Sequence, residues 1–406
     1  VLVIGIIGCG YIADFYVENI KKSNTLKINS CFDINQKRLI EFANHYKIFP
    51  EKNIKNLLHN KEINTILNLT PPEEHYKINK LCLLNGKNVY CEKPLTLSFE
   101  ESKDLISICK EKKLRLWTAP SIIHNELSII LRKKFTPKLN MENITGYAHF
   151  ESPSLAKLKV QKWVNPSGAN WPIKNEIING PIIEHSGYLI SLLCSLFGPV
   201  IKVSSMPYKI ISNAEKKLAN LPFEKIGNNH CIANLFFKNN IFITLIISEK
   251  TKARRSLELY DENISLLVSD IRDDYSAIIY KDNRSRNLIS SRDNRLHHIV
   301  RRISNFLPTF FAMPFLVSNP FSYNKRIIIK KLDFLQLIKN QKPANFIKGL
   351  EALKLSMESK NEGNFMEDFF LHCNEVTLKL NQVCKEDKFK STFNHKKLNE
   401  FLIFID

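Results

Sequence analysis

The sequence has no long uninterrupted hydrophobic run. The apolar stretch at residues 306–321 is broken by Pro308, Pro314 and Pro320, and a proline in a helix interior kinks or ends that helix. The stretch is therefore too short and too bent to cross a bilayer, and we expect no stable membrane span. The first residues also lack the basic region of a signal peptide, so we expect a cytoplasmic protein.

Cysteine and metal-binding motifs are missing as well. The nine cysteines are scattered along the chain, without a Cys-x-x-Cys pair and without a histidine at metal-ligand spacing. This pattern predicts reduced thiols that pack in or near cores, including Cys9 and Cys91. The sequence therefore predicts no metal site.

Negative charge is scarce. The chain has 59 Lys and Arg against 40 Asp and Glu, a net charge of +19. The basic residues are spread among many Asn and Ile, with denser stretches at 250–255, 292–302 and 325–331. We interpret these stretches as a solvated face, with attraction of an anionic substrate, a nucleotide sugar or a membrane surface as alternatives. We expect no nucleic-acid partner.

The remaining composition is that of a globular protein with two domains. A length of 406 residues exceeds what one core normally supports. Hydrophobic residues make up 44% and charged residues 24% of the chain, which is ordinary for a soluble globular protein. We find no internal repeat and no low-complexity linker.

The chain opens with an apolar run, a glycine turn and a helical pattern, VLVIGIIGCGYIA. Gly8 allows a tight turn, and Gly10 lets the backbone approach a phosphate closely. The following helix would direct its first N–H groups at that phosphate. We therefore place the pyrophosphate of a dinucleotide at residues 8–12, which include Tyr11 and Ile12; an ordinary strand–turn–helix is the alternative.

An acidic residue supports the dinucleotide interpretation. Asp33 lies 20 residues after Ala13, at the end of the apolar run 26–32, where a carboxylate can accept hydrogen bonds from both ribose hydroxyls. Ile34 follows it, so no basic residue stands directly beside it to bind a 2′-phosphate. NAD is therefore favoured, while Lys37 and Arg38 keep NADP possible.

Short apolar strands alternate with helical segments through residue 118. This alternation predicts an α/β fold with an N-terminal Rossmann domain at residues 1–119, built on a doubly wound parallel sheet. Ligands of such sheets bind at the carboxyl ends of the strands. Gly10, Asp33, Thr70 and Lys93 all fall at such ends, so one crevice could collect them.

Residues 120–406 show a different pattern, for which we expect an α+β domain that binds substrate and mediates oligomerisation. Its open, mostly antiparallel sheet would use strands at 146–151, 201–205, 231–237, 241–248, 256–260 and 264–268. Asn239-Asn240 suits a hairpin turn because Asn tolerates positive φ. Helices at 333–340, 350–359 and 369–383 would close the domain. We expect the basic and Pro-rich segment 292–321 to be a buried connection, with a cleft cover, a subunit contact or a membrane contact as alternatives.

Several motifs resemble those of one family of oxidoreductases. GIIGCGYIA, Asp33, TPPEEH at 70–75, YCEKP at 90–94 and NGPIIEHSGYLISLL at 179–193 follow one another in this order. Together they resemble the Gfo/Idh/MocA family of glucose-fructose oxidoreductase, inositol dehydrogenase and rhizopine-catabolism proteins. The resemblance covers the N-terminal domain well and continues more loosely to about residue 380.

The resemblance implies a function and a set of site residues. Family members are typically NAD(P)-dependent dehydrogenases that act on sugar-like hydroxyls or ketones, and they are often dimers or tetramers. Lys93 would lie near the nicotinamide and the reacting hydroxyl, where a cation stabilises a developing alkoxide; a solvated surface lysine is the alternative. Glu92 would belong to the same cofactor-binding turn. Thr70, Pro71 and His75 would lie beside the nicotinamide ribose, although His75 could simply occupy a helix surface.

The sequence departs from the family at its second signature. The family places an Asp and a general-base His one helical turn apart, whereas here Glu184 and Tyr188 hold these positions. An unperturbed tyrosine, with a pKa of about 10, is a poor base at neutral pH, unless Lys93 lowers its pKa. His185 could supply an imidazole, but it lies about 100° around the helix from Glu184. Catalysis by Tyr188, catalysis by His185 and a substrate-shaping role for both remain open.

These features predict hydride transfer between NAD and a sugar, cyclitol or nucleotide-sugar hydroxyl or ketone. In the oxidation direction Tyr188 would accept the hydroxyl proton, Lys93 would polarise the oxygen and Glu184 would orient either of them. One alternative is a cofactor-binding relative that has lost turnover and acts as a sensor or assembly subunit. Another is NAD used catalytically within glycoside cleavage. Trp163 and Trp171 could stack on a sugar face or serve packing alone.

Overall fold

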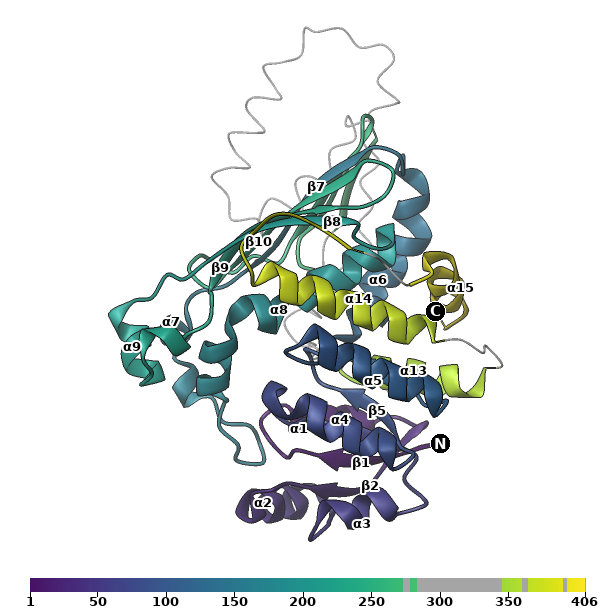
Figure 1. Cartoon of the computed structure of the whole chain (residues 1–406), viewed down its shortest axis with the longest axis vertical. Helices are drawn as coiled ribbons and strands as arrows, with labels where there is room; N and C mark the ends of the chain where they lie inside the picture. Colours follow the sequence, from purple (N-terminus) through teal and green to yellow (C-terminus); the bar gives the residue numbers. More distant parts are fainter. Residues whose placement is uncertain (273–277, 283–344, 360–363, 390–392, 406) are drawn as a thin grey trace, which may run out of the picture.

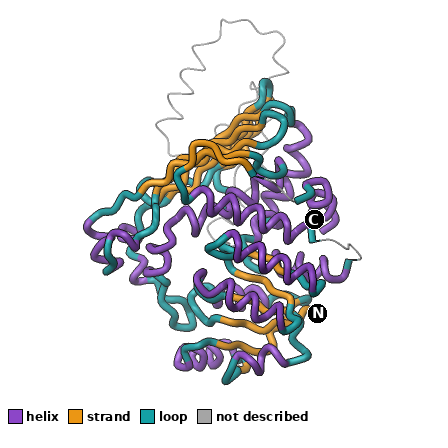
Figure 2. Tube along the Cα trace, in the orientation of Figure 1, coloured by secondary structure: helices purple, strands orange, loops and turns teal. Residues whose placement is uncertain are grey.

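The chain folds around two β-sheets with helices between them. The computed structural model describes residues 1–272, 278–282, 345–359, 364–389 and 393–405. Figure 2 shows the strands of the N-terminal sheet at the bottom and those of the second sheet at the top, with helices in the space between. The segment 292–321 and the expected helix at 333–340 lie outside the described residues.

The N-terminal sheet is parallel throughout and has the strand order β3-β2-β1-β4-β5-β6. This order confirms the expected doubly wound Rossmann sheet. Its strands are β1 (Leu2–Ile7), β2 (Leu26–Phe32), β3 (Phe49–Pro50), β4 (Thr65–Asn68), β5 (Asn88–Cys91) and β6 (Leu116–Thr118). The helices between them are α1 (Ala13–Ile20), α2 (Gln36–Tyr46), α3 (Ile54–His59), α4 (His75–Leu84) and α5 (Phe99–Glu111).

The second sheet has eight strands in the order β13-β12-β11-β7-β10-β9-β8-β14. All neighbours are antiparallel except β7 and β10, which run parallel; the expected open, mostly antiparallel sheet is confirmed. Asn239 and Asn240 both have positive φ, 61° and 56°, in the predicted hairpin turn. The strands are β7 (Ile144–Glu151), β8 (Lys202–Tyr208), β9 (His230–Phe236), β10 (Ile241–Ser248), β11 (Leu257–Tyr260), β12 (Ile264–Val268), β13 (Ile278–Asp282) and β14 (Cys384–Lys388).

One long helix, α8 (Ile173–Phe197), lies between the two sheets (Figure 1). Its backbone is interrupted at Gly180, where φ is 69°, and Pro181 follows. A Cβ at Gly180 would lie 2.3 Å from the carbonyl oxygen of Asn228, so this position requires glycine. The interruption divides α8 into two parts that present different side chains to the site described below. Shorter helices lie on either side of it, α6 (Glu126–Ile130), α7 (Leu155–Leu158) and α9 (Asn213–Ala219).

We expected the C-terminal helices only to close the second domain. In the structure they also contact the first domain. Helices α13 (Lys348–Glu358) and α14 (Phe365–Leu380) also pack against the Rossmann domain, and α15 (His395–Ile405) follows them. Trp117 of β6 donates its indole N–H to Glu367 at 3.2 Å, and the N–H of Leu95 donates to Asn374 at 3.2 Å. The end of the chain therefore contacts both domains.

The apolar faces of both sheets contribute to the core. The largest cluster of buried side chains runs from Ile4 and Ile6 of β1 to Leu189 and Leu193 of α8 and on to β10. A smaller cluster covers the other face of the Rossmann sheet. Within the described residues, no helix is both long enough and apolar enough to span a membrane.

Candidate functional site at the carboxyl ends of the Rossmann strands

The glycine turn after β1 has the shape expected of a phosphate-binding loop. Gly8 has a φ of 96°, and a Cβ there would lie 2.7 Å from the backbone of Leu69, so only glycine fits. Gly10 is different, because a Cβ added there would meet no atom within 4 Å. The backbone of Gly10 therefore borders open space in front of α1, where a phosphate would fit. Tyr11 and Ile12 follow in the turn before α1.

Asp33 lies next to this turn. One of its carboxylate oxygens accepts the N–H of Cys9 at 2.8 Å, and the other accepts the N–H of Asn35 at 2.8 Å. The half-buried carboxylate is thus fixed at the end of β2, where its remaining lone pairs could accept ribose hydroxyls. The structure places Asp33 and Gly10 at the same edge of the sheet, as predicted.

Arg38 is engaged in protein contacts. Its Nε donates to the carbonyl of Cys9 at 2.6 Å, and one terminal nitrogen donates to the carbonyl of Ser167 at 2.6 Å. The other terminal nitrogen donates to the Ser167 hydroxyl. A guanidinium held by three acceptors is not free to bind a 2′-phosphate, which favours NAD at this position.

The loop after β4 is tied to the loop after β5 by His75. Thr70 donates its hydroxyl to the side chain of Asn68 at 2.7 Å, and Pro71 precedes a short 3₁₀ turn that leads into α4. The two ring nitrogens of His75 lie 2.8 Å from the carbonyl of Thr70 and 2.6 Å from that of Pro94. His75 is fully buried, so the alternative of a helix-surface residue is wrong. Burial lowers the pKa of His75 despite these carbonyls.

Glu92 has a structural partner. Tyr16 of α1 donates its hydroxyl to one carboxylate oxygen of Glu92 at 2.7 Å, and the N–H of Lys93 donates to the other at 3.1 Å. These contacts fix the start of the Glu-Lys-Pro turn relative to the helix that follows the glycine turn. Glu92 thus positions Lys93.

The closest ionic contact of the site joins the two domains. Lys93 donates to Oε2 of Glu184 at 2.5 Å, and Asn179 donates to Oε1 of the same carboxylate at 2.8 Å. Burial alone would lower the pKa of Lys93, but the carboxylate of Glu184, followed by those of Glu176 and Glu92, outweighs burial and raises that pKa. Lys93 is therefore a permanent cation, and the alternative of a solvated surface lysine is wrong.

Tyr188 lies one helical turn after Glu184 and packs between an aromatic ring and a cation. Its ring stacks on Phe150 of β7 at a centroid distance of 5.6 Å. The guanidinium carbon of Arg272 lies 5.0 Å from the centroid of the Tyr188 ring. Within the described residues the Tyr188 hydroxyl has no hydrogen-bond partner, so it is available to a ligand.

His185 points away from Glu184, as its helical position predicts. Its Nε2 lies 3.7 Å from Glu176 and 3.9 Å from Glu249, the residue that follows β10. Burial, followed by the charges of Lys93 and Arg272, lowers the pKa of His185 well below its usual value. The imidazole is therefore neutral at physiological pH.

The two carboxyl groups beside His185, those of Glu176 and Glu249, have raised pKa values. Burial and the neighbouring Glu184 raise the pKa of Glu176 to about 8. Burial is also the main cause that raises the pKa of Glu249 to about 8. Both groups are thus mainly protonated at neutral pH.

These three side chains are the one group in the described part of the chain that could hold a metal ion, since their ligand atoms all lie within 4.8 Å of one another. The sequence does not indicate this cluster because Glu249 is distant along the chain from Glu176 and His185, which share α8. The cations Lys93 and Arg272 act electrostatically on the same groups and oppose a divalent ion there. We therefore assign protons, not a metal, to Glu176 and Glu249.

A loop of the second domain covers the glycine turn. Asp14 of α1 accepts the N–H of Ser167 at 2.8 Å and its hydroxyl at 2.6 Å, and Asn165 donates to the carbonyl of Tyr11 at 3.0 Å. Trp171 packs edge-on against Tyr11 at 4.8 Å and against Trp163 at 5.3 Å. The tryptophans thus pack on the turn and on each other.

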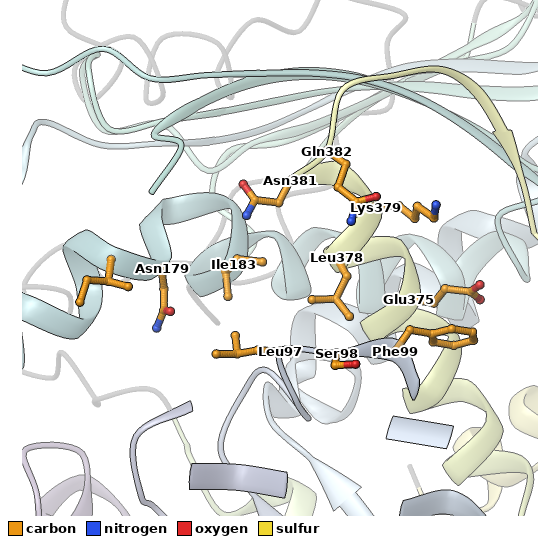
Figure 3. A pocket seen from close by; sticks show the side chains of 11 residues that line it. Leu97, Ser98, Phe99, Asn179, Ile183, Glu375, Leu378, Lys379, Asn381 and Gln382 are labelled. Atoms are coloured by element: carbon orange, nitrogen blue, oxygen red, sulfur yellow. The ribbon is translucent and has the colours of Figure 1, made fainter. Parts of the chain in front are cut away.

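A separate pocket lies behind the site. It has a volume of about 580 Å³ and lies between α8, α14 and the start of α5 (Figure 3). Asn179, the partner of Glu184, is part of its wall. Neither Lys93 nor Tyr188 lines it, and Asn179 is the residue that this pocket shares with the site.

Sequence reasoning missed four residues of this site. Asn179, Glu176, Glu249 and Arg272 surround Glu184, His185 and Tyr188. Asn179 and Glu176 lie before the interruption of α8, and Glu249 and Arg272 follow strands of the second sheet. Only the position of Asn179 beside Gly180 in the NGP motif was a signal available in the sequence.

The parallel sheet and the glycine turn define a Rossmann domain of the dinucleotide-binding kind. Residues 2–119 match the model of the oxidoreductase family with an NAD-binding Rossmann fold, Gfo/Idh/MocA. The N-terminal domain thus matches this family, which confirms the resemblance of its motifs.

Individual relatives agree with this assignment. Oxidoreductase P35 from Formosa agariphila is 27% identical over 48% of this chain and 60% of its own length. Myo-inositol 2-dehydrogenase from Thermotoga maritima is 28% identical over 28% of this chain and 35% of its own length. The chain thus matches less than two thirds of these relatives. KijD10, a 3-ketoreductase from Actinomadura kijaniata solved with NADP and TDP-benzene, shares the fold over 94% of this chain and 97% of its own, with a TM-score of 0.66 and 12% identity.

Proposed function

We propose that the chain is an NAD(P)-dependent dehydrogenase that transfers a hydride between the cofactor and a hydroxyl or ketone of a sugar, cyclitol or nucleotide sugar. The observation that carries this proposal is the pair Lys93–Glu184, which puts a fixed cation at the end of β5. Tyr188 presents an unbonded hydroxyl one helical turn from Glu184. A cation and a proton-transfer group on one side of a crevice are what oxidation of an alcohol requires.

The residues of the Rossmann domain fit the cofactor. The open space at Gly10 accommodates a phosphate, and the carboxylate of Asp33 accommodates ribose hydroxyls. We assign the cofactor contacts to Gly8, Gly10, Tyr11, Ile12, Asp33, Thr70, Pro71, His75, Glu92 and Lys93. We infer that His75 and Glu92 act mainly by positioning the loops that carry Thr70 and Lys93, and that NAD is preferred over NADP.

Each side chain of the site has its own role in the proposed hydride transfer. When bound, the nicotinamide supplies the hydride acceptor. Lys93 holds its charge against the reacting oxygen and stabilises the alkoxide as the proton leaves. Tyr188 exchanges that proton, and Glu184 orients Lys93 while Asn179 fixes Glu184. His185 is directed at Glu176 and Glu249, so we assign it a supporting role.

We also propose that the chain forms a homo-oligomer through its second sheet. Large side chains are exposed on β8, its neighbour β9, and β7, which is separated from β9 by β10; their exposed fractions are 69% for Met206, 64% for Tyr208, 48% for Ile232 and 49% for Tyr147. A patch of this kind favours association with another copy. Light scattering on the wild type and on Met206→Lys tests it, since the variant should shift the mass toward the monomer.

Turnover is the deciding experiment for the proposed function. Purified protein would be mixed with NAD or NADP and a panel of sugars, cyclitols and nucleotide sugars, and NAD(P)H formation followed by absorbance. We expect turnover with at least one class and a preference for NAD. NADH binding without any turnover would contradict the proposal and favour the sensor or assembly alternative. Glycoside cleavage without net NADH would favour catalytic use of NAD in that reaction.

A further inference from the structure

The pocket beside Asn179 takes no part in the mechanism above. Its volume of about 580 Å³ lies in the range of small-molecule sites. Leu97, just before α5, lies across from Ile183 of α8 and Leu378 of α14 (Figure 3). The middle of the pocket is therefore an apolar slot between side chains from three separate elements, and groups that form hydrogen bonds lie at its ends.

One end of the slot carries charges of both signs. Glu375 and Lys379 lie four residues apart on α14, so they share a face of the helix. Both line the pocket at the end away from Asn179 (Figure 3). Lys379 also contacts Asp387 at 3.0 Å, but both side chains of that pair are 39% exposed, and an exposed pair contributes little free energy. The carboxylate of Glu375 lies 4.0 Å from Nδ1 of His372. A ligand at this end therefore meets a carboxylate and an ammonium.

The other end of the slot reaches the Lys93–Glu184 pair through Asn179. This side chain is only 8% exposed. Its amide nitrogen donates to Oε1 of Glu184 at 2.8 Å, and Oε2 of Glu184 accepts from Lys93. The Oδ1 atom of Asn179 is an acceptor on the same residue that lines the pocket. A ligand that moves Asn179 would therefore change how Glu184 holds Lys93.

A second set of contacts connects the pocket to the interruption of α8. Asn381 lines the pocket, and its Oδ1 accepts the side-chain amide of Asn228 at 3.0 Å. The backbone carbonyl of Asn228 lies so close to Gly180 that no Cβ would fit there. Two residues of the pocket wall, Asn179 and Asn381, thus contact the part of α8 that precedes Glu184.

We propose that this pocket is an effector site for a free α-amino acid with a large apolar side chain. The ammonium of the amino acid pairs with Glu375 and its carboxylate with Lys379, since charge-assisted hydrogen bonds of this kind are the strong ones. Its side chain fills the slot between Leu97 and Leu378, where burial of apolar surface adds affinity. The inference goes beyond the proposed function, because the pocket is separate from the proposed substrate site.

Calorimetry on the full chain tests the binding of amino acids. The probes are L-leucine, L-methionine and L-phenylalanine, and glycine is the counterpart without a side chain. For the amino acid that binds best, the corresponding amine lacks the carboxylate and the N-acetyl derivative lacks the ammonium. We expect this amino acid to bind about tenfold or more tightly than glycine and than either derivative, as one charge-assisted contact would provide.

Two variants assign the contacts to the charged residues. In Glu375→Gln the advantage of the amino acid over its N-acetyl derivative should disappear. In Lys379→Gln the advantage over the amine should disappear. Lys396→Gln is the matched control, because it removes an exposed lysine of α15 that pairs with Glu400 within the same helix; it should bind as the wild type does. Thermal unfolding of each variant shows that the fold is kept.

Titration with NADH tests the connection to the Lys93–Glu184 pair. We expect a saturating amino acid to change the affinity of the wild type for NADH about fivefold or more, the usual size of coupling between two sites. An NADH affinity that does not depend on the amino acid would overturn the role as an effector site.

Three results would overturn the site itself: no amino acid binds, the derivatives bind as tightly, or both variants keep the full preference. Failure of the proposed function looks different. In that case the amino acid still binds and still depends on Glu375 and Lys379, but no sugar, cyclitol or nucleotide sugar is oxidised or reduced.

Discussion

At the scale of single residues, Tyr188 is the group to which we assign the proton transfer of the proposed function. Its hydroxyl is unbonded within the described residues, while its ring is held by Phe150 and Arg272. The fixed charge of Lys93, which Glu184 holds in place, lies in the same site.

Tyr188→Phe tests this role directly. The variant keeps the ring and its stacking, so we expect unchanged thermal stability and a loss of turnover of about 100-fold or more, the usual contribution of a proton-transfer group. Steady-state kinetics with the best substrate of the panel measure it. Tyr76→Phe is the control, since its hydroxyl contacts Asp104 on α5, away from the site. Equal turnover of Tyr188→Phe and wild type would remove Tyr188 from the mechanism.

The raised pKa of Glu249 predicts a specific dependence of stability on pH. The folded pKa of about 8 exceeds the usual value of 4.5, mainly because Glu249 is buried. Between these values the folded chain keeps a proton that the unfolded chain releases, so stability falls as pH rises from about 4.5 to about 8. The neighbouring Glu215 and Glu184 raise this pKa, and Lys250 lowers it.

Glu249→Gln removes this titration while keeping the shape of the side chain. We expect the melting temperature of the variant to match that of the wild type at pH 5 and to exceed it by several degrees at pH 9. Scanning fluorimetry between these pH values measures the difference. Glu262→Gln, an exposed carboxylate, should follow the wild type at every pH. A constant offset for Glu249→Gln would show that packing, not protonation, is what changed.

At the scale of elements, the glycine turn combines two glycines with different tasks. A Cβ at Gly8 would collide with backbone atoms of Leu69, and its φ is positive. A Cβ at Gly10 would enter open space. The first glycine is therefore required by the fold, and we propose that the second is required by the cofactor.

Two alanine variants separate these tasks. We expect Gly8→Ala to be strongly destabilised, since it adds backbone strain and a steric clash. Gly10→Ala should keep the melting temperature of the wild type but bind NADH at least about tenfold more weakly, because its methyl group occupies the phosphate position. Fluorescence titration with NADH measures the affinity. Normal NADH binding by Gly10→Ala would show that the cofactor does not use this turn.

The elements differ in how far the sequence predicts them. Strands β10 and β12 begin and end at the predicted residues because alternating apolar side chains define them. The strand ends that carry Asp33, Thr70 and Lys93 follow from the alternation of strands and helices. The cluster of Glu176, His185 and Glu249 could not be predicted. It forms only because α8, which is interrupted at Gly180, packs next to the end of β10. The contacts of α14 with β6 likewise depend on tertiary packing alone.

At the scale of the whole molecule, side chains of the second domain contact the Rossmann domain on more than one side of the proposed cofactor site. Lys93 and Glu184 form one contact, near the reacting groups. Asp14, Ser167 and Arg38 form the other, beside the glycine turn. The second domain therefore supports both ends of the site, and the cofactor's affinity should depend on residues that do not touch it.

Asp14→Ala tests this dependence. Asp14 is buried and accepts the N–H and the hydroxyl of Ser167, so its loss leaves the buried N–H without an acceptor and the hydroxyl with only the long contact to Asn165 at 3.3 Å as an acceptor. We expect a loss of stability of about 1–3 kcal/mol in chemical denaturation. We also expect weaker NADH binding, because the loop at 163–171 no longer supports the turn at Tyr11. Asp104→Ala, which removes a half-exposed surface ion pair with Lys80, should change neither quantity appreciably. If Asp14→Ala lowers stability but binds NADH as the wild type does, the loop serves only to join the domains, and the glycine turn holds its shape without it.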